Sequence, residues 1–380
     1  MNRKDFKNPT VRDVAQHASV SVGTVSNVLN ARGNVSAARR ASVEASMAAL
    51  GFQPNRVAQS LRRSESRVIG LCTPLTSSAY FAALLETFES VAAQQDYEVM
   101  QVLSHADPTL ELRRVQALIG RNVDGLILIP THDPSATLSL LAVRGTPTVI
   151  VDRVFDDARF DYFAIDDRAA MRAATAQVIA LGHRRLLYVV RDMRLPTTQR
   201  RIEGYRDAAI AADAASTGHT AEAASGSICA AVLQRDPDEA AFAREIQAAL
   251  TQNLKAPTVL IASNSVIALS LIRLLGELGV RWPDDVSVLV FDEPVWAPIL
   301  TPPLAVMRHP TQAIALAAWE RLLARLATPD LPPIRVMFEA SLVGGPSLAA
   351  PRLGHQTSSG SAKDKALAEA AVKRQISPRS

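Results

Sequence analysis

A stretch near the start of the chain, residues 10–30, places polar side chains on one face of a predicted helix. Thr10, with Asp13 three residues later, has the pattern of an N-cap for a first short helix, and Ser21 has the pattern of a cap for a second. Val25 and its apolar neighbours at helical spacing would face inward. Two short helices joined by a tight turn form a helix-turn-helix, which can place its second helix in the major groove of DNA. The outer face of that helix would carry four residues: Val22, Gly23, Ser26 and Asn27.

Positive charge is concentrated in the same part of the chain. The net charge is +4, but residues 1–66 contain ten Lys/Arg and four Asp/Glu, which gives this segment +6. The remaining residues contain 31 basic and 33 acidic side chains, a net charge of −2. A small basic module is typical of contact with nucleic-acid phosphates. Charge alone would favour a merely solvated face, so the interpretation depends on the helix-turn-helix pattern beside it.

The composition predicts a folded protein of two or three domains, because 380 residues are too many for one ordinary core. No apolar run approaches the roughly 20 residues of a membrane span, and the amino end lacks the apolar segment of an export signal. Cys72 and Cys229 lie far apart among apolar residues, which supports neither a disulfide framework nor a zinc site. We therefore expect a cytoplasmic protein with no membrane partner, no metal and no other cofactor.

The helix-turn-helix is followed by a third helical pattern and a basic connector. Ser36 and Gly51 have the patterns of an N-cap and a C′ residue around this third helix. Asn55 could cap a further short helix that runs to Arg62, and so short a helix would need DNA and a second copy of the chain to order it. A plain basic linker is the alternative. The expected core of the module has six residues: Val14, Val25, Val28, Val43, Met47 and Leu50.

From Arg67 onward, apolar strand patterns alternate with helical ones. The first set of strands begins at Val68, Tyr97, Asp124 and Thr148. The second set covers residues 162–165, 185–190, 258–262 and 286–291. This alternation is typical of right-handed βαβ units. Two successive sets predict an α/β core of two doubly wound parallel-sheet subdomains.

Ligands of doubly wound folds bind at the carboxyl ends of the strands. Polar residues that follow the predicted strands are therefore candidate binding residues: Asp133, Asp152, Arg153, Asp166, Asp167, Asn264, Asp292 and Glu293.

An ordered series of motifs over residues 9–347 resembles the LacI/GalR family of transcriptional regulators. It begins with V-R-D-V-A-Q-H-A-S-V-S-V-G-T-V-S-N-V-L-N at 11–30, G-F-Q-P-N at 51–55 and R-V-A-Q-S-L at 56–61. It continues with V-D-G-L-I-L at 123–128, V-D-R at 151–153, L-G-H-R-R-L at 181–186 and R-I-E-G-Y-R at 201–206. It ends with W-P-D-D-V-S-V at 282–288, F-D-E at 291–293 and L-T-P-P-L at 300–304.

The resemblance implies a small all-α headpiece and a core like that of periplasmic sugar-binding proteins, with an effector held between two lobes. The expected domains are a headpiece at 1–53, a hinge at 54–66, the core at 67–350 and a disordered tail at 351–380. Lobe 1 is expected at about 67–165 and 309–328, and lobe 2 at about 166–308 and 329–350. The chain is expected to cross between the lobes near Asp166, near Met307–Pro310 and near Thr328–Pro332.

The resemblance also implies a homodimer, with a tetramer as the alternative, whose paired headpieces bind a pseudo-palindromic operator in double-stranded DNA. Asn27 stands where the family commonly has arginine, which favours adenine or a weaker contact. Leu61 matches the residue that the family pairs with its twin in the minor groove. The expected DNA-contact residues, from the resemblance and from the caps and spacing above, are Thr10, Ser21, Val22, Gly23, Thr24, Ser26, Asn27, Asn55, Arg56, Ala58 and Leu61.

Six residues match effector-contact positions of the family: Tyr80, Phe81, Arg153, Arg201, Asn264 and Asp292. The strand-end candidates Asp133 and Asp167 complete the eight expected effector residues. A core role is the alternative for the aromatic pair, and a surface salt bridge is the alternative for the two arginines. Ser265 and Glu293 replace two aspartates of the family pattern, so the effector class stays open among sugars, sugar phosphates, nucleosides and purines.

Taken together, the sequence predicts a DNA-binding transcriptional regulator, a repressor in the first place, that a small effector controls allosterically. The alternative is a solute-binding protein of the same fold without a DNA function. No catalytic residue is expected, because the sequence shows no G-x-G-x-x-G after a strand, no P-loop and no Ser/His/Asp set in motif context.

Overall fold

The computed structural model describes residues 9–29, 33, 35–52, 65–75, 78–216, 227–252 and 255–352. The chain divides into two compact units, Met1–Arg67 and Val68–Ser380. Each unit has a hydrophobic core of its own. Most of the predicted hinge and nearly all of the predicted tail lie outside the described residues.

The first unit consists of three short helices, α1 (Val11–His17), α2 (Val22–Leu29) and α3 (Ala37–Leu50). The predicted caps of the first two helices are confirmed. The backbone N–H of Thr10 donates to the Asp13 carboxylate over 2.7 Å, and the Ser21 hydroxyl oxygen accepts from the backbone N–H of Thr24 over 3.1 Å. After α3, Gly51 has a φ of 62°, a left-handed conformation that glycine adopts without a steric penalty.

The core of this unit differs in detail from the predicted one. Met47 and Leu50 are only partly buried, whereas Phe52 is buried with an exposed fraction of 8%. Phe52 follows the turn at Gly51, so the period of the α3 helix could not indicate which way its ring faces. The other four predicted core residues are buried: Val14, Val25, Val28 and Val43.

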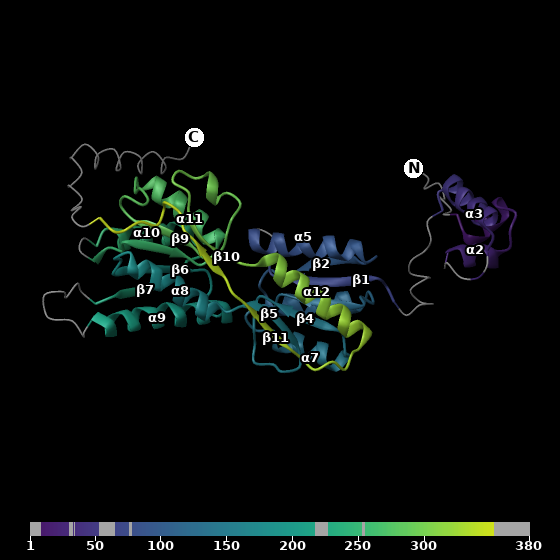
Figure 1. The fold of residues 1–380 in the computed structure, drawn as a ribbon, viewed down its shortest axis with the longest axis horizontal. Coiled ribbons are helices and arrows are strands. Elements are labelled where there is room, and N and C mark those ends of the chain that lie inside the picture. The colour runs from purple at the N-terminus through teal and green to yellow at the C-terminus, as the bar shows by residue number, and fades with distance from the viewer. Residues whose placement is uncertain are drawn as a thin grey trace, which may run out of the picture. The chain divides into compact units, whose positions relative to one another are not determined.

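The second unit contains two six-stranded sheets, which confirms the predicted pair of doubly wound subdomains (Figure 1). Sheet 1 is parallel throughout, in the order β11 (Arg335–Phe338), β5 (Asp161–Ile165), β4 (Thr148–Val151), β3 (Gly125–Leu128), β1 (Val68–Thr73), β2 (Glu98–Leu103). Sheet 2 has the order β12 (Ser341–Val343), β10 (Ala305–Arg308), β9 (Ser287–Val290), β8 (Val259–Ala262), β6 (Arg185–Val190), β7 (Cys229–Gln234). Only β12 runs antiparallel to its neighbour among the described strands of sheet 2.

Helices cover both sheets. Those of the first lobe are α5 (Ala79–Gln94), α6 (Pro108–Ile119), α7 (Ser135–Arg144) and α12 (Thr311–Ala327). Those of the second lobe are α8 (Asp167–Ala180), α9 (Pro196–Ser216), α10 (Glu239–Leu250), α11 (Ser265–Glu277) and the 3-10 turn Ala297–Ile299. Within the described residues, no helix has the length and apolar character needed to span a lipid bilayer.

The lobe boundary near the carboxyl end differs from the expected one. Residues 329–350 were expected in lobe 2, but β11 pairs with β5 at the edge of sheet 1. The third crossing therefore falls between β11 and β12, where Figure 1 shows the yellow segment passing from one sheet to the other. The apolar run of this edge strand, residues 336–338, has only three members, and such a run is too short to predict a strand. The other two crossings lie where they were expected, between β5 and α8 and between β10 and α12.

A glycine in α9 allows the backbones of α8 and α9 to approach closely. A Cβ atom built on Gly204 would lie 2.1 Å from the carbonyl oxygen of Arg168. We expect Gly204→Ala to lower the free energy of unfolding by about 1–3 kcal/mol, because two helix backbones must separate. Urea denaturation would measure the loss. Gly276→Ala in α11 is the control: no atom lies within 4 Å of its added Cβ, and alanine should stabilise that helix by about 0.5–1 kcal/mol. Equal unfolding midpoints for the two variants would contradict the account.

Candidate functional site

The α2 helix presents three of the predicted DNA-contact residues to solvent. Val22 is 47% exposed, and Gly23 and Asn27 are also exposed. On the opposite side of the helix, Val25 and Val28 are buried in the three-helix core. Because the core fixes the rotation of α2, its outer face is available to enter a groove of matching width, as a recognition helix does.

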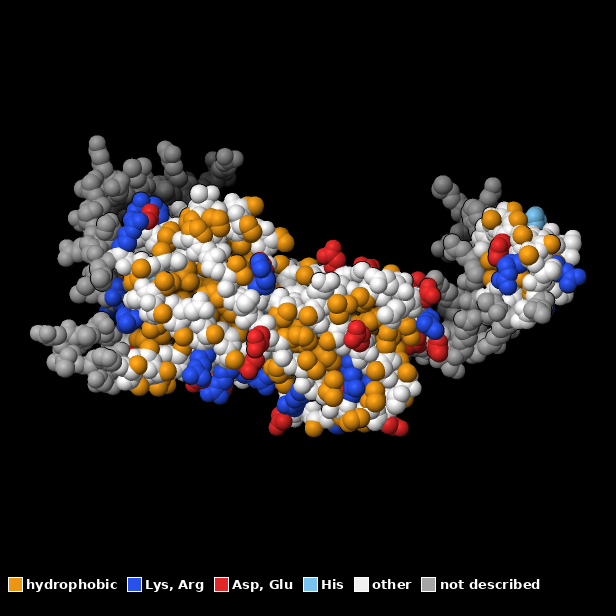
Figure 2. Space-filling view, viewed as in Figure 1, with side chains coloured by type: hydrophobic (Ala, Val, Ile, Leu, Met, Phe, Trp, Pro, Cys, Tyr) orange, Lys and Arg blue, Asp and Glu red, His pale blue; other side chains and the backbone are white. Residues whose placement is uncertain are grey.

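The chemistry of this face suits DNA. The Asn27 side chain offers both a hydrogen-bond donor and an acceptor, and Val22 offers an apolar contact of the kind that fits a thymine methyl group. The hydroxyl oxygens of Ser21 and Thr24 lie 2.9 Å apart at the start of the helix, where phosphate oxygens are commonly bound. Figure 2 shows basic side chains on the face of this unit in view.

The other predicted DNA-contact residues differ in their exposure, and some lie outside the described residues. Thr10 is exposed and caps α1, whereas Ser26 is partly buried in α2. The four hinge residues lie outside the described residues, so their roles stay predictions: Asn55, Arg56, Ala58 and Leu61.

A cleft in the second unit lies at the carboxyl ends of strands from both sheets. Its cavity has a volume of about 80 Å³. Segments that follow β1, β4, β6, β8, β9 and β10 all line it, together with the beginnings of α5 and α9. Such an arrangement matches the rule that ligands of doubly wound folds bind beyond the carboxyl ends of their strands.

Six of the eight predicted effector residues line this cleft: Tyr80, Phe81, Arg153, Arg201, Asn264 and Asp292. Asp167 does not line the cleft, but its carboxylate accepts a hydrogen bond from Arg201, which does. Asp133 does not line the cleft. It is exposed before α7, and its carboxylate accepts from the Ser135 hydroxyl over 2.7 Å. The chain beyond β3 stays buried through Thr131, so Asp133 comes too far from the strand end to reach the cleft.

A buried ion pair organises the centre of the cleft. The Arg201 Nε donates to the Asp167 carboxylate over 2.6 Å, its Nη1 donates to the Ser263 carbonyl oxygen over 3.1 Å, and its guanidinium lies 4.2 Å from the centre of the Phe291 ring. Burial raises the pKa of Asp167 to about 6, although Arg201 opposes the shift. Burial would lower the pKa of Arg201, but the Asp167 carboxylate raises it above its ordinary value.

Asp152 adds a second buried carboxylate beside the first. Burial raises its pKa, and the neighbouring Arg153 lowers it. The Arg153 Nε lies 3.5 Å from this carboxylate. The φ of Asp152 is 72°, a left-handed conformation that costs a non-glycine residue free energy and recurs at functional sites.

Several buried polar atoms around the cleft have no hydrogen-bond partner within the described parts of the chain. They are the Ser263 and Ser265 hydroxyls, the Asp292 Oδ1 and both ring nitrogens of His309. The Asp292 Oδ2, by contrast, accepts from the Ser265 backbone N–H over 2.9 Å. Because an unpaired buried polar atom costs free energy, a ligand bearing hydroxyl or similar groups would gain by pairing with these atoms.

Sequence reasoning missed several lining residues. Arg191, Thr198 and His309 line the cleft, and Asp152 was considered only as a strand-end candidate. Arg191 directly follows β6 and His309 directly follows β10. The end of β6 was predicted, and its strand-end position is a signal for Arg191. No strand was predicted at β10, so the same rule could not indicate His309.

Burial of His309 beside the cleft makes the free energy of unfolding depend on pH. Its ring packs edge-on against Tyr80 and Phe291, and burial, aided by Arg201, lowers its pKa to about 3. The unfolded chain takes up a proton at this histidine below about pH 6.5, whereas the folded chain does not. Stability contributed by His309 is therefore present above pH 6.5 and lost as the pH falls.

We expect His309→Phe to remove this acid sensitivity. Between about pH 7 and pH 5, the wild-type protein should lose about 2 kcal/mol more unfolding free energy than the variant. Urea denaturation of both proteins at the two pH values measures the difference. Asp167 titrates in the opposite direction but is present in both proteins, so its effect cancels. Parallel pH dependences would contradict the assignment.

Comparisons with known proteins agree with this geometry. Residues 10–55 match the family model of bacterial regulatory proteins of the lacI family, and residues 175–348 match that of a periplasmic binding protein-like domain. The ribose operon repressor of Haemophilus influenzae is 27% identical over 321 residues, which cover 84% of this chain and 93% of the relative. The transcriptional regulator GalR of Escherichia coli is 26% identical over 344 residues, 90% of this chain and 97% of the relative.

A solved structure shares the architecture. The lac repressor dimer bound to operator and the anti-inducer ONPF has a TM-score of 0.75 and 24% identity, and the match covers 90% of this chain and all of that chain. The curated relatives are named as transcriptional regulators, and the headpiece and core match in the same order along the chain. Residues 10–55 are therefore a headpiece of the lacI family of bacterial regulatory proteins, and a periplasmic binding protein-like domain follows it in the same chain.

Proposed function

We propose that this protein is a sequence-specific DNA-binding regulator that acts as a repressor in the cytoplasm. Its affinity for an operator changes when a small effector binds between the lobes. One observation carries the proposal. A single chain combines an exposed α2 face, held by a small core, with a cleft whose buried polar atoms lack partners among the described residues. Neither feature needs a catalytic step, and the proposal includes none.

The effector is a hydroxyl-rich small molecule, for which a sugar is the simplest case. Carboxylates, hydroxyls and arginines surround the cleft, and the Phe291 ring lines it beside Arg201. Arginine forks and carboxylates hold hydroxyls in fixed directions, and aromatic rings stack on the apolar face of a sugar. Among related proteins, one is named a ribose operon repressor, and one structure is titled a complex of the regulator CelR with cellobiose.

Two headpieces acting together provide the DNA specificity. A helix with few base-reading side chains recognises little sequence alone, so we propose a homodimer that binds two half-sites about one helical turn apart. The structure titled as the lac repressor dimer bound to operator supports this arrangement. An effector can alter the affinity only by binding the two arrangements of the lobes unequally.

Selection of bound DNA from a random library by the full-length protein tests the proposal. We expect a pseudo-palindromic sequence, with a binding constant that falls steeply as salt rises because phosphate contacts release counterions. Val22→Ala should change which bases are selected, whereas Val143→Ala, an 86% exposed position of α7, should leave the selected sequence unchanged. Recovery of random sequence would overturn sequence-specific binding, and recovery of no DNA even at low salt would favour a solute-binding protein without a DNA function.

A further inference from the structure

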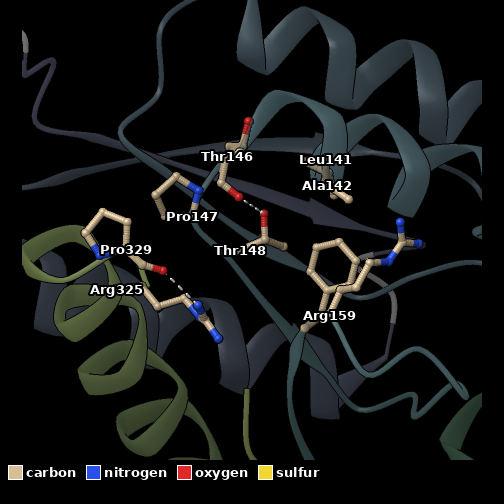
Figure 3. A pocket seen from close by; sticks show the side chains of 10 residues that line it. Leu141, Ala142, Thr146, Pro147, Thr148, Arg159, Arg325 and Pro329 are labelled. Atoms are coloured by element: carbon tan, nitrogen blue, oxygen red, sulfur yellow. Dashed lines mark hydrogen bonds between the residues drawn. The ribbon is translucent and has the colours of Figure 1, made fainter. Parts of the chain in front are cut away.

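Figure 3 shows a second pocket, which lies in lobe 1. It adjoins the amino ends of β4 and β5, whereas the cleft lies at the carboxyl ends of the strands. Its walls come from the end of α7, the segment that leads into β4, the segment before β5 and the last turn of α12. The cavity has a volume of about 280 Å³. That volume is near the lower end of small-molecule sites, roughly 300 Å³, so it suits a compact ligand.

Arg325 makes this pocket unusual because its guanidinium is only partly satisfied. The residue is 9% exposed. Its Nε donates to the Asp161 carboxylate. Its Nη1 donates to the Pro329 carbonyl oxygen over 3.2 Å, a contact that Figure 3 shows. Its Nη2 is buried and has no acceptor within the described residues. A buried donor without an acceptor costs free energy, and more so when it carries charge.

The surrounding charges do not balance Arg325. Asp161 is fully buried, and its carboxylate also pairs with Arg321 over 3.0 Å and accepts from the backbone N–H of Ile334 over 2.8 Å. Two guanidinium groups thus share one carboxylate. Asp330 is exposed and forms no ion pair with either arginine among the described residues. A buried cation that lacks its own counter-ion is costly, and an anion entering the pocket would supply one.

The rest of the pocket surface is largely apolar or already paired. Leu141, Pro147 and Phe160 provide apolar walls. The Thr148 hydroxyl donates to the Thr146 carbonyl oxygen over 2.8 Å. The ligand therefore needs one charged end, for Arg325, and a body that buries apolar surface.

We propose that this pocket binds a small organic oxyanion, a carboxylate or a phosphate monoester on a ring-sized apolar body. Its oxygen accepts from Arg325, and its body packs on Leu141 and Phe160. Since the walls belong to α7, α12 and the segments that precede β4 and β5, the bound anion joins these elements of lobe 1. The site is separate from the effector cleft, so it does not depend on the proposed control of DNA binding.

Titration of the full-length protein followed by ¹⁹F NMR tests the site. The probes are 4-fluorobenzoate, 4-fluorophenyl phosphate and the neutral 4-fluorobenzyl alcohol. We expect at least one anion to bind about tenfold or more tightly than the alcohol, because a charge-assisted hydrogen bond is lost in the neutral probe. The tighter anion identifies the carboxylate or the phosphate as the preferred group.

Arg325→Gln should weaken the binding of the preferred anion by about tenfold or more. Ala142→Trp fills the pocket, leaves the Arg325–Asp161 pair in place and should abolish binding even if Arg325→Gln proves unstable. Arg144→Gln, an exposed cation at the end of α7, is the control for general electrostatic attraction and should bind as the wild type does. The proposal is overturned if neither anion binds better than the alcohol. It is also overturned if Ala142→Trp binds normally, or if Arg144→Gln loses as much affinity as Arg325→Gln.

Discussion

Replacement of Val25 by aspartate should abolish specific DNA binding while the core of the protein stays folded. Val25 has no exposed surface and packs within the three-helix core of the headpiece. Burying an unpaired carboxylate costs several kcal/mol. A helical module of this size has little stability to spare, so we expect it to unfold and to lose operator affinity by about 100-fold or more.

Fluorescence anisotropy with the selected operator measures this loss. The control variant, Ala38→Asp, introduces the same charge at an exposed position in the first turn of α3, where the helix dipole favours a negative charge. It should lower operator affinity by no more than a few-fold. Thermal unfolding of the second unit should be unchanged in both variants, because that unit has its own core. A Val25→Asp protein that keeps operator affinity within about tenfold of wild type would contradict the assignment of α2.

Arg201→Ala should be the most destabilising single truncation in the cleft. The variant leaves Asp167, which is 2% exposed, without the cation that now lies 2.6 Å from it. Removing one member of a buried pair typically costs about 3–5 kcal/mol, because the remaining charge is uncompensated. The contact of the guanidinium with the Phe291 ring is lost as well.

The pH dependence of this loss follows from Asp167. Its pKa is already raised to about 6 in the folded wild type. Without Arg201 that pKa should rise further, because burial and the neighbouring Asp152 carboxylate both raise it and the main opposing cation is gone. A group with a raised folded pKa favours folding at low pH, and this contribution disappears as the pH rises through the folded pKa. Arg201→Ala should therefore cost more unfolding free energy at about pH 8 than at about pH 5.

Urea denaturation at both pH values provides the measurement. Arg194→Ala removes an exposed partner of Asp192 and should cost less than about 1 kcal/mol at either pH. The double variant Arg201→Met with Asp167→Leu should recover much of the loss, because no buried charge remains. A penalty for Arg201→Ala that does not vary with pH would show that Asp167 stays ionised and would contradict the raised pKa.

The sequence predicted structure best where an element depends on residues close to it in the chain. The caps at Thr10 and Ser21 depend on residues three positions away, and both are present. Phe52 escaped prediction because the turn at Gly51 ends the helical period that would have placed it. Strand β11 escaped because its pairing with β5 joins residues far apart in the chain, and no local pattern encodes such a partner.

The cleft could be predicted in outline, since a parallel sheet brings the carboxyl ends of its strands together. This rule gave Arg153, Asn264 and Asp292, all of which line the cleft. Four other residues that the rule gave do not line the cleft: Asp133, Asp166, Asp167 and Glu293. For Asp133 the reason is that the chain beyond β3 continues buried before it turns. The pairing of Arg201 with Asp167 could not be derived from spacing, because it depends on how closely α8 and α9 pack.

The most direct test of the account is the affinity of the full-length protein for its selected operator, with and without a ligand that stabilises the core in a thermal-shift screen of sugars and nucleosides. We predict that the ligand changes the operator dissociation constant by about fivefold or more. The variant Asp292→Asn removes the charge of a carboxylate that lines the cleft. In this variant the ligand should no longer change the operator dissociation constant, while the protein still binds operator. A ligand that stabilises the wild type but not Asp292→Asn, yet leaves operator affinity unchanged, would contradict the coupling of cleft to headpiece.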